Sequence, residues 1–171
     1  NSIGEWVLKS ACAQNKAWQD SGLKPIKMAV NLSAKQILNP NLVSDIKEIL
    51  SETGLDAKYL ELEITESIAI KDTLYVLDVL GQISDLGVMI AIDDFGMEYS
   101  SLSRLKQLPA DMLKIDLEFI QGIETSLNDR AIVTVIINLA KSLNLKVLAE
   151  GVETQDQLEF LRYHHCDYIQ G

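Results

Sequence analysis

Val-Met-Ile-Ala-Ile-Asp-Asp-Phe-Gly, at residues 88–96, joins a short apolar run to two adjacent carboxylates. The length and β-branched content of residues 88–92 favour a buried parallel strand over a helix. Two like charges side by side cost free energy unless cations or hydrogen-bond donors lie against them. Asp93 and Asp94 therefore predict a metal site or a paired acid and base at the end of this strand. The alternative is an Asp-Asp turn that caps the following helix.

Strands and helices alternate on both sides of this stretch. Strands are expected at 26–30, 59–64, 88–92, 111–116, 145–149 and 166–169, and helices at 2–19, 41–53, 72–86, 100–108, 127–142 and from 154 to about 163. The first helix should bury the face that carries Ile3, Trp6, Val7, Ala11 and Cys12. Such alternation predicts an α/β fold with parallel strands joined by right-handed crossovers. Neither a dinucleotide-type glycine fingerprint nor a P-loop follows the first strand, which disfavours a nucleotide-binding doubly wound sheet.

Each predicted strand ends in a polar or ionisable side chain. In a barrel of parallel strands the active site lies at the carboxyl ends, and inward positions recur with period two. This period places one polar side chain per strand on the same side, namely Asn31, Glu63, Asp93, Lys114 and Glu150, with Gln170 continuing the series. Taken singly, each is a plausible turn former or ordinary polar residue, but their alignment predicts a site.

These residue types suit hard cations. Carboxylate and amide oxygens are the ligands that Mg²⁺ or Mn²⁺ prefers, and the lack of a His or Cys cluster argues against zinc. Lys114 among these acids is suited to a phosphate oxygen or a metal-bound water. His164 and His165 precede the sixth strand, so they are expected at the opposite end of the barrel, away from catalysis.

Composition limits the partners. The 171 residues are 47% hydrophobic, enough for one core and a single domain over 1–171. A net charge of −10 disfavours DNA and anionic membranes, although divalent metals could still bridge the protein to a small phosphate ligand. No apolar run reaches the roughly 20 residues of a membrane span, and residues at the N-terminus lack the charged-then-apolar pattern that is typical of a signal peptide. Cys12 and Cys166 are expected to pack in the core of a cytoplasmic protein rather than to form a disulfide or bind metal.

Six ordered motifs carry a family resemblance. They are Asn31-Leu32-Ser33-x-x-Gln36, Glu63-Ile64-Thr65-Glu66-Ser67, Asp93-Asp94-Phe95-Gly96-x-x-Tyr99-Ser100-Ser101-Leu102, Leu113-Lys114-Ile115-Asp116, Ala149-Glu150-Gly151-Val152-Glu153-Thr154 and Gln170-Gly171. In this order they resemble the motifs of bacterial EAL domains. The resemblance implies a TIM-type (β/α)8 barrel, here with about six of the strands, that hydrolyses cyclic di-GMP to linear pGpG with two Mg²⁺ or Mn²⁺ ions.

The resemblance also implies residue roles. Asn31, Glu63, Asp93 and Asp94 would bind the metals, with Asp93 shared between the two ions. Lys114 would orient the attacking water, Glu150 would act as a base or support a ligand, and Glu66 would hold the loop after Asp94. Asp116, Glu153 and Gln170 would complete the substrate pocket. Family members often form homodimers, and an upstream sensor or GGDEF-type domain is expected in the full-length protein, which a membrane could anchor.

Two departures from the family pattern stand out. The Glu-Ala-Leu segment of the first strand is absent, as are the closing strand and final helix, so the chain is expected to be part of a longer domain and inactive alone. Met97-Glu98 stands where the family usually has Thr-Gly, and Glu98 would resist backbone angles that glycine allows. These departures leave open a degenerate domain that senses cyclic di-GMP or binds other proteins without cleavage. A purely structural dimerisation domain is disfavoured because Lys114, Glu150 and Glu153 are retained.

Overall fold

The structure is a computed structural model that describes residues 3–70, 74–97 and 102–171. These residues divide into two compact units. Among the described residues, the first comprises 3–64, 74–90 and 107–109, and the second comprises 65–70, 91–97, 102–106 and 110–171. The expectation of a single domain over 1–171 stays a prediction.

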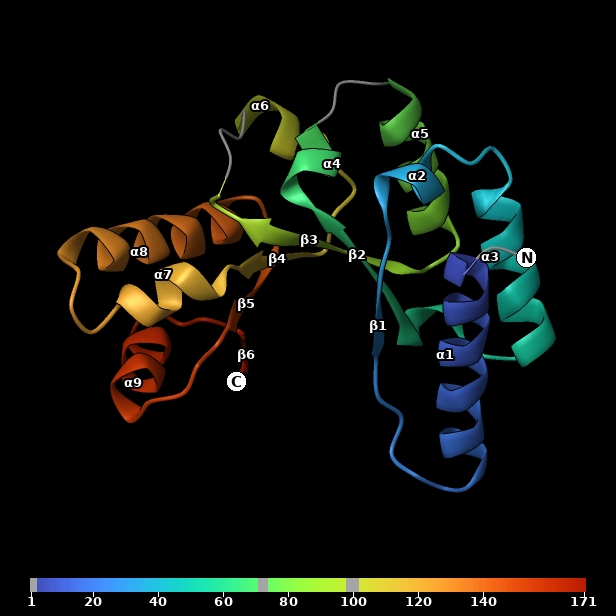
Figure 1. The fold of residues 1–171 in the computed structure, drawn as a ribbon, viewed down its shortest axis with the longest axis horizontal. Helices are drawn as coiled ribbons and strands as arrows, with labels where there is room; N and C mark the ends of the chain where they lie inside the picture. The colour runs from blue at the N-terminus through green and yellow to red at the C-terminus, as the bar shows by residue number, and fades with distance from the viewer. Residues whose placement is uncertain (1–2, 71–73, 98–101) are drawn as a thin grey trace. The chain divides into compact units, whose positions relative to one another are not determined.

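The first unit packs helices against a parallel strand pair. Its elements are α1 (Ile3–Asp20), β1 (Met28–Asn31), α2 (Ala34–Ile37), α3 (Leu42–Thr53), the 3-10 helix η1 (Ala57–Tyr59), β2 (Leu60–Thr65, continuing into the second unit) and α5 (Leu74–Asp85). Helix α1 lies against α3 and β1 (Figure 1). Strand β1 pairs with β2 in parallel, with Ala29 opposite Glu61 and Asn31 opposite Glu63.

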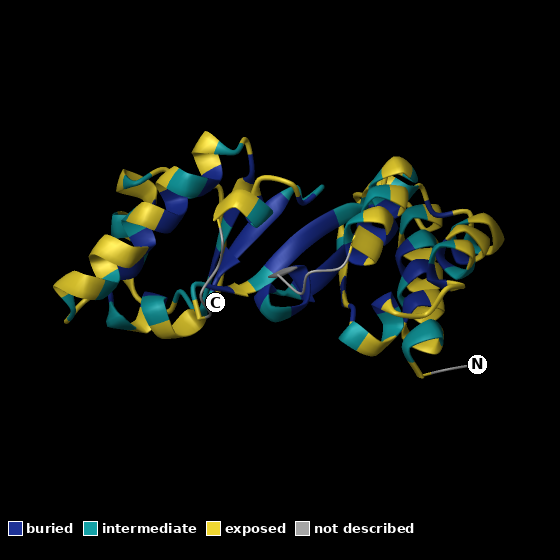
Figure 2. Ribbon diagram, turned by 90° about the horizontal axis from the view of Figure 1, so that it is seen from above, coloured by how far each residue is buried: buried dark blue, intermediate teal, exposed yellow. Residues whose placement is uncertain are grey.

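The second unit contains most of β3 (Met89–Phe95) and three further parallel strands. The other elements are α4 (Glu66–Ile70), α6 (Leu102–Leu105), β4 (Met112–Ile115), α7 (Leu117–Gly122), α8 (Leu127–Ser142), β5 (Lys146–Glu150), α9 (Gln155–Tyr163) and β6 (Tyr168–Gln170). Strand β3 pairs with β4, β4 with β5 and β5 with β6. The central strands are buried and the outer helix faces are exposed (Figure 2). The predicted α/β class with parallel strands is confirmed.

Local signals in the sequence mark the ends of several helices. Ser126 Oγ accepts a hydrogen bond from the Asp129 N–H and begins α8, which matches the predicted 127–142. Thr154 and Gln157 form a reciprocal capping box at the start of α9, which agrees with the predicted helix from 154 to about 163. Gly54 ends α3 with a φ of 69°, the left-handed conformation that glycine adopts without steric cost.

Strand β3 differs from the prediction. It continues through Asp93 and Asp94 to Phe95, so the paired carboxylates lie within the strand rather than after it. The pairing with β4 is regular up to Ile92 and shifts before Phe95, which marks a bulge, and Asp94 has a φ of 55°. A bulge turns the strand locally and re-aims its side chains, and it has no periodic sequence signal.

The buried face predicted for α1 is partly wrong. Ile3 is 82% exposed and Trp6 is 66% exposed, whereas the buried residues are Leu8, Cys12 and Asn15. Asn15 donates from Nδ2 to the carbonyls of Ile26 at 3.0 Å and Tyr59 at 3.3 Å. A polar side chain therefore sets the inward face, and an apolar pattern alone does not reveal it.

The two cysteines are free thiols. Cys12 and Cys166 form no disulfide, and burial raises the pKa of each thiol to about 11. Both thiols are therefore protonated and unreactive at neutral pH. In the described part of the chain, none of the helices combines the length and the apolar character that a membrane span requires.

Candidate functional site

Three carboxylates converge in the second unit. Asp93 and Asp94 from β3 and Glu150 from the end of β5 each offer an oxygen, and these oxygens lie within 4.8 Å of one another. Hard divalent cations bind such clusters of carboxylate oxygens. The donor set therefore fits a cation of the Mg²⁺ or Mn²⁺ type.

Lys114 partly compensates this negative charge. Its Nζ lies 2.9 Å from Asp93 Oδ1 and 2.8 Å from Glu150 Oε1, and the residue is only 4% exposed. Register explains the placement, because Lys114 is opposite Leu148 and Glu150 is two residues further along β5 on the same side of the sheet. One ammonium faces three carboxylates, so the cluster keeps a negative charge that a bound cation would offset.

Asp94 experiences the crowding of negative charge most directly. Partial desolvation raises its pKa above the ordinary value, and the charge of Asp93 and the charge and hydrogen bond of Asp116 raise it further, with a smaller contribution from Glu150. Each cause favours the neutral acid over the carboxylate. A nearby divalent cation would act in the opposite direction.

A cavity of about 300 Å³ adjoins Asp94. Its lining consists of Thr65, Glu66, Ser67, Asp94, Met97 and Asp116. The hydroxyls of Thr65 and Ser67 lie 3.0 Å apart and are hydrogen-bonded. Sequence analysis missed both hydroxyls as site residues, although they flank Glu66 in the Thr-Glu-Ser run.

Glu66 contacts the turn that follows Asp94. This residue is 2% exposed, and its Oε2 accepts a hydrogen bond of 2.9 Å from the Gly96 N–H. Glu66 begins α4, a helix too short to show a period in the sequence. It thereby ties α4 to the turn that follows Asp93 and Asp94.

Asn31 and Glu63 belong to the first unit. They are register partners in β1 and β2, so both side chains leave the sheet on the same side, as the period of two predicted. Glu63 is buried and Asn31 is exposed. Their roles as metal ligands stay predictions.

The remaining predicted site residues lie near the ends of β4, β5 and β6. Gln170 pairs with Glu150, and its carbonyl accepts from the Val152 N–H at 3.0 Å. Asp116 is the N-cap of α7, with Oδ1 accepting from the Glu118 N–H at 2.7 Å. Glu153 is exposed in the loop after β5.

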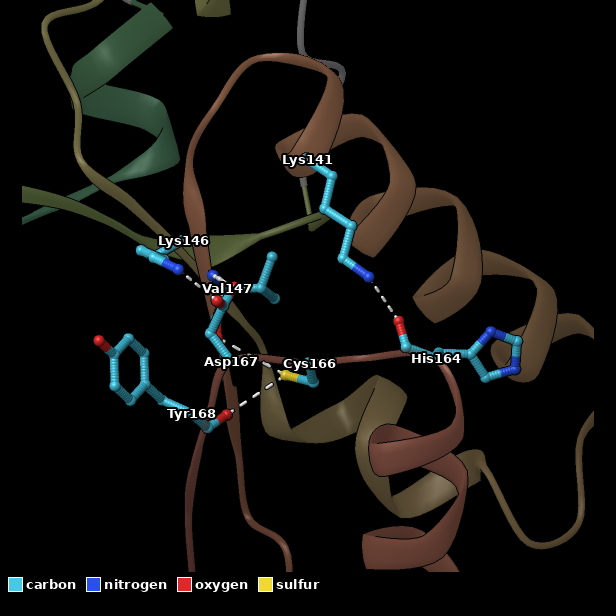
Figure 3. Close-up of polar contacts among 7 residues, drawn as sticks. All are labelled: Lys141, Lys146, Val147, His164, Cys166, Asp167 and Tyr168. Atoms are coloured by element: carbon cyan, nitrogen blue, oxygen red, sulfur yellow. Dashed lines mark hydrogen bonds and ion pairs between the residues drawn. The ribbon is translucent and has the colours of Figure 1, made fainter.

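The opposite ends of β5 and β6 carry a separate set of contacts (Figure 3). The Lys141 ammonium donates to the His164 carbonyl at 2.7 Å, and the Cys166 thiol donates to the carbonyls of Val147 and Tyr168. His164 ends α9, and His165 follows it. Both histidines thus precede β6, at the end away from Glu150 and Gln170, as predicted.

Comparison with known proteins decides the family. The sequence model of the EAL domain matches residues 1–171. The chain belongs to the EAL domain family.

Relatives of this EAL domain include the bifunctional diguanylate cyclase/cyclic di-GMP phosphodiesterase MucR of Pseudomonas aeruginosa. It is 48% identical over 169 residues, which cover 99% of this chain and 25% of MucR. The chain therefore spans a quarter of that relative's length. The solved structure of the PaMucR phosphodiesterase in complex with c-di-GMP has a TM-score of 0.94 and 48% identity, over 99% of this chain and 68% of that one. The fold is thus the TIM-barrel-like fold of EAL domains, of which this chain contains six strands among its described residues.

Metal is present in another related structure. Klebsiella pneumoniae BlrP1, in a manganese/cy-diGMP complex, is 30% identical with a TM-score of 0.83, over 96% of this chain and 42% of that one. Manganese thus occurs in a relative, and this EAL domain has an acidic cluster whose carboxylate oxygens suit a divalent cation.

The departure at Met97-Glu98 is described only in part. Met97 is 49% exposed and lines the cavity beside Asp94. Glu98 and the Tyr99-Ser100-Ser101 part of the motif lie outside the described residues.

Proposed function

We propose that this EAL domain hydrolyses cyclic di-GMP to linear pGpG with two bound Mg²⁺ or Mn²⁺ ions. The observation that carries the proposal is the convergence of Asp93, Asp94 and Glu150 on one point, with the Lys114 ammonium between two of them. Two relatives add support, because MucR is a bifunctional diguanylate cyclase/cyclic di-GMP phosphodiesterase and the BlrP1 complex contains manganese.

In this proposal the acidic residues hold the metals. Asp93 and Asp94 would hold the ions together with the Glu63 carboxylate and the Asn31 side-chain amide. Bound ions would supply Lewis acidity, which lowers the pKa of water and offsets charge on the phosphate. Asp116, Glu153 and Gln170 line the substrate pocket.

Lys114 and Glu150 act on the attacking water. The Lys114 ammonium orients its oxygen, and the Glu150 carboxylate accepts a proton or supports a metal ligand. The water oxygen forms a bond to phosphorus and gives up its proton, while one phosphodiester P–O bond breaks and the leaving ribose oxygen takes up a proton from solvent, so the ring opens to pGpG. The buried Lys114 ammonium is already in place, so it would stabilise the developing negative charge without reorganisation.

The proposal extends to the protein's surroundings. We infer a cytoplasmic domain that forms homodimers and lies downstream of a sensor or GGDEF-type domain, without binding DNA. The bifunctional cyclase and phosphodiesterase relative supports the domain partner.

Turnover of cyclic di-GMP tests the proposal. The protein, in its natural sequence context, is incubated with cyclic di-GMP and Mg²⁺ or Mn²⁺, with EDTA as the control. We expect pGpG to form only with metal. If the protein neither bound nor hydrolysed cyclic di-GMP, the proposed function would be rejected, although the assignment of the fold would stand.

A sensor that binds cyclic di-GMP without cleaving it is the second candidate. Met97 favours it, because this exposed thioether lines the cavity at a position where the family usually has threonine. Binding of cyclic di-GMP with no pGpG in the same assay would select the sensor.

A further inference from the structure

Helix α7 packs against the segment that follows β5. The Ile120 carbonyl accepts a hydrogen bond of 3.3 Å from Gln157 Nε2, and Gln157 Oε1 accepts from the Glu153 N–H at 2.8 Å. At Gly151, an added Cβ would lie 2.9 Å from the Leu117 Cβ. The backbone directly after Glu150 is therefore held against α7 at two points.

The same helix braces the turn at the end of β3. An added Cβ at Gly96 would lie 2.9 Å from Phe119 Cε2 and 3.1 Å from Ile136 Cδ1. The edge of the Phe119 ring thus occupies the space in which a side chain of residue 96 would stand. On the polar side, the Gly96 N–H is held by Glu66 at 2.9 Å.

The turn at residues 94–96 includes an unfavourable backbone conformation. Asp94 has a φ of 55° and Gly96 a φ of 106°, with the buried Phe95 between them. An L-residue in the left-handed region costs free energy, and it persists where the surrounding structure over-determines it. The contacts of Gly96 with Glu66 and Phe119 hold the backbone of this turn in place.

We propose that Phe119 is a positioning residue that holds the Asp94–Gly96 turn, and thereby directs the Asp94 carboxylate toward those of Asp93 and Glu150. This inference rests on the proposed metal-binding function of the cluster. Without the ring, Asp94 can relax to ordinary backbone angles, and its carboxylate leaves the cluster.

The test compares three variants in the natural sequence context. Phe119→Ala removes the ring, Phe119→Leu keeps an apolar contact, and Ile123→Val perturbs a fully buried residue directly after α7. Two quantities are measured, namely hydrogen exchange of the Gly96 amide without metal, and the Mn²⁺ dissociation constant from the electron paramagnetic resonance (EPR) signal of the free ion. Ile123→Val controls for a general loss of stability.

We expect Phe119→Ala to accelerate Gly96 exchange beyond the effect of Ile123→Val and to weaken Mn²⁺ binding about 10- to 100-fold, as loss of groups that support metal ligands does. Phe119→Leu should recover most of both effects. Equal behaviour of Phe119→Ala and Ile123→Val in either measurement would overturn the inference. If the unmodified protein binds no Mn²⁺, the proposed function fails, and the Gly96 amide alone then decides whether Phe119 positions the turn.

Discussion

The charge balance at Lys114 is the central feature at the scale of single residues. Its buried ammonium contacts Asp93 and Glu150, and the pKa of the nearby Asp94 is raised by desolvation and by the surrounding negative charge. Removing one member of a buried ion pair leaves an uncompensated charge, which is more costly than the pair itself is stabilising. Lys114 therefore stabilises the folded cluster, in which three carboxylates still outnumber the one ammonium.

Replacement of Lys114 by Met tests how much its positive charge stabilises the cluster. The side chain keeps its length but loses its charge, so the carboxylates repel one another without compensation. We expect the free energy of unfolding to fall by about 3 kcal/mol at neutral pH in EDTA. Urea denaturation in EDTA and in Mn²⁺ measures the effect, and Mn²⁺ should recover part of it because the ion replaces the lost positive charge. Wild-type stability of Lys114→Met in EDTA would contradict this account.

At the scale of elements, close packing between α7 and the strand ends sets the shape of the site. Gly151 and Gly54 both have a φ of 69°, but their surroundings differ. A Cβ at Gly151 would lie 2.9 Å from the Leu117 Cβ, whereas a Cβ at Gly54 would meet only the flexible Lys16 side chain at 3.5 Å. An alanine at Gly54 would meet backbone strain alone, whereas an alanine at Gly151 would meet both backbone strain and steric crowding.

The matched substitutions Gly151→Ala and Gly54→Ala test this difference. Gly54→Ala should cost about 1 kcal/mol, from the left-handed backbone alone. Gly151→Ala should cost about 1–3 kcal/mol more, because overpacking against Leu117 adds to the strain. Chemical denaturation of both variants gives the comparison, and equal losses would show that α7 does not confine the segment after β5.

A second element-scale feature links the starts of β5 and β6 (Figure 3). Asp167 accepts hydrogen bonds from Lys146 Nζ at 2.6 Å and from the Val147 N–H at 3.0 Å. Burial acts to raise the pKa of Asp167, but these two hydrogen bonds outweigh it, and the pKa is lowered overall. The folded state therefore favours the carboxylate more than the unfolded chain does.

This contact predicts a pH dependence of stability. Because the folded pKa lies below the unfolded value near 3.9, the stabilisation is complete above that value and is lost as the pH falls through the folded pKa. Asp167→Asn should lower the free energy of unfolding by about 1 kcal/mol at pH 7, with a shrinking difference from wild type below about pH 4. Urea titrations at several pH values measure it. A constant difference down to pH 2 would refute the assignment.

At the scale of the whole molecule, the strand ends were the most predictable part. Asn31, Glu63, Lys114 and Glu150 follow a period of two, and the strand positions around them were correct within a few residues because parallel strands leave short apolar runs. The start of α9 was also predictable, because its N-cap Thr154 is a local signal in the sequence.

What could not be predicted depends on tertiary contacts. Helices α2, α4 and α7 have only four to six residues, too few to show a helical period, although Ser33 and Gln36 form a capping box that could have revealed α2. The bulge at Asp94 and the buried Asn15 likewise depend on partners distant in sequence. The bracing contact of Phe119 with Gly96 followed from none of the sequence patterns.

The most direct test of the central claim is a Mn²⁺ titration of the wild-type protein and of Asp93→Asn, followed by the EPR signal of free Mn²⁺. His165→Asn is the control, because His165 precedes β6 and asparagine tolerates its φ of 59°. The account predicts that the wild type and His165→Asn bind Mn²⁺ alike, and that Asp93→Asn weakens binding by more than about ten-fold. Undiminished Mn²⁺ binding by Asp93→Asn, or none by the wild type, would contradict it.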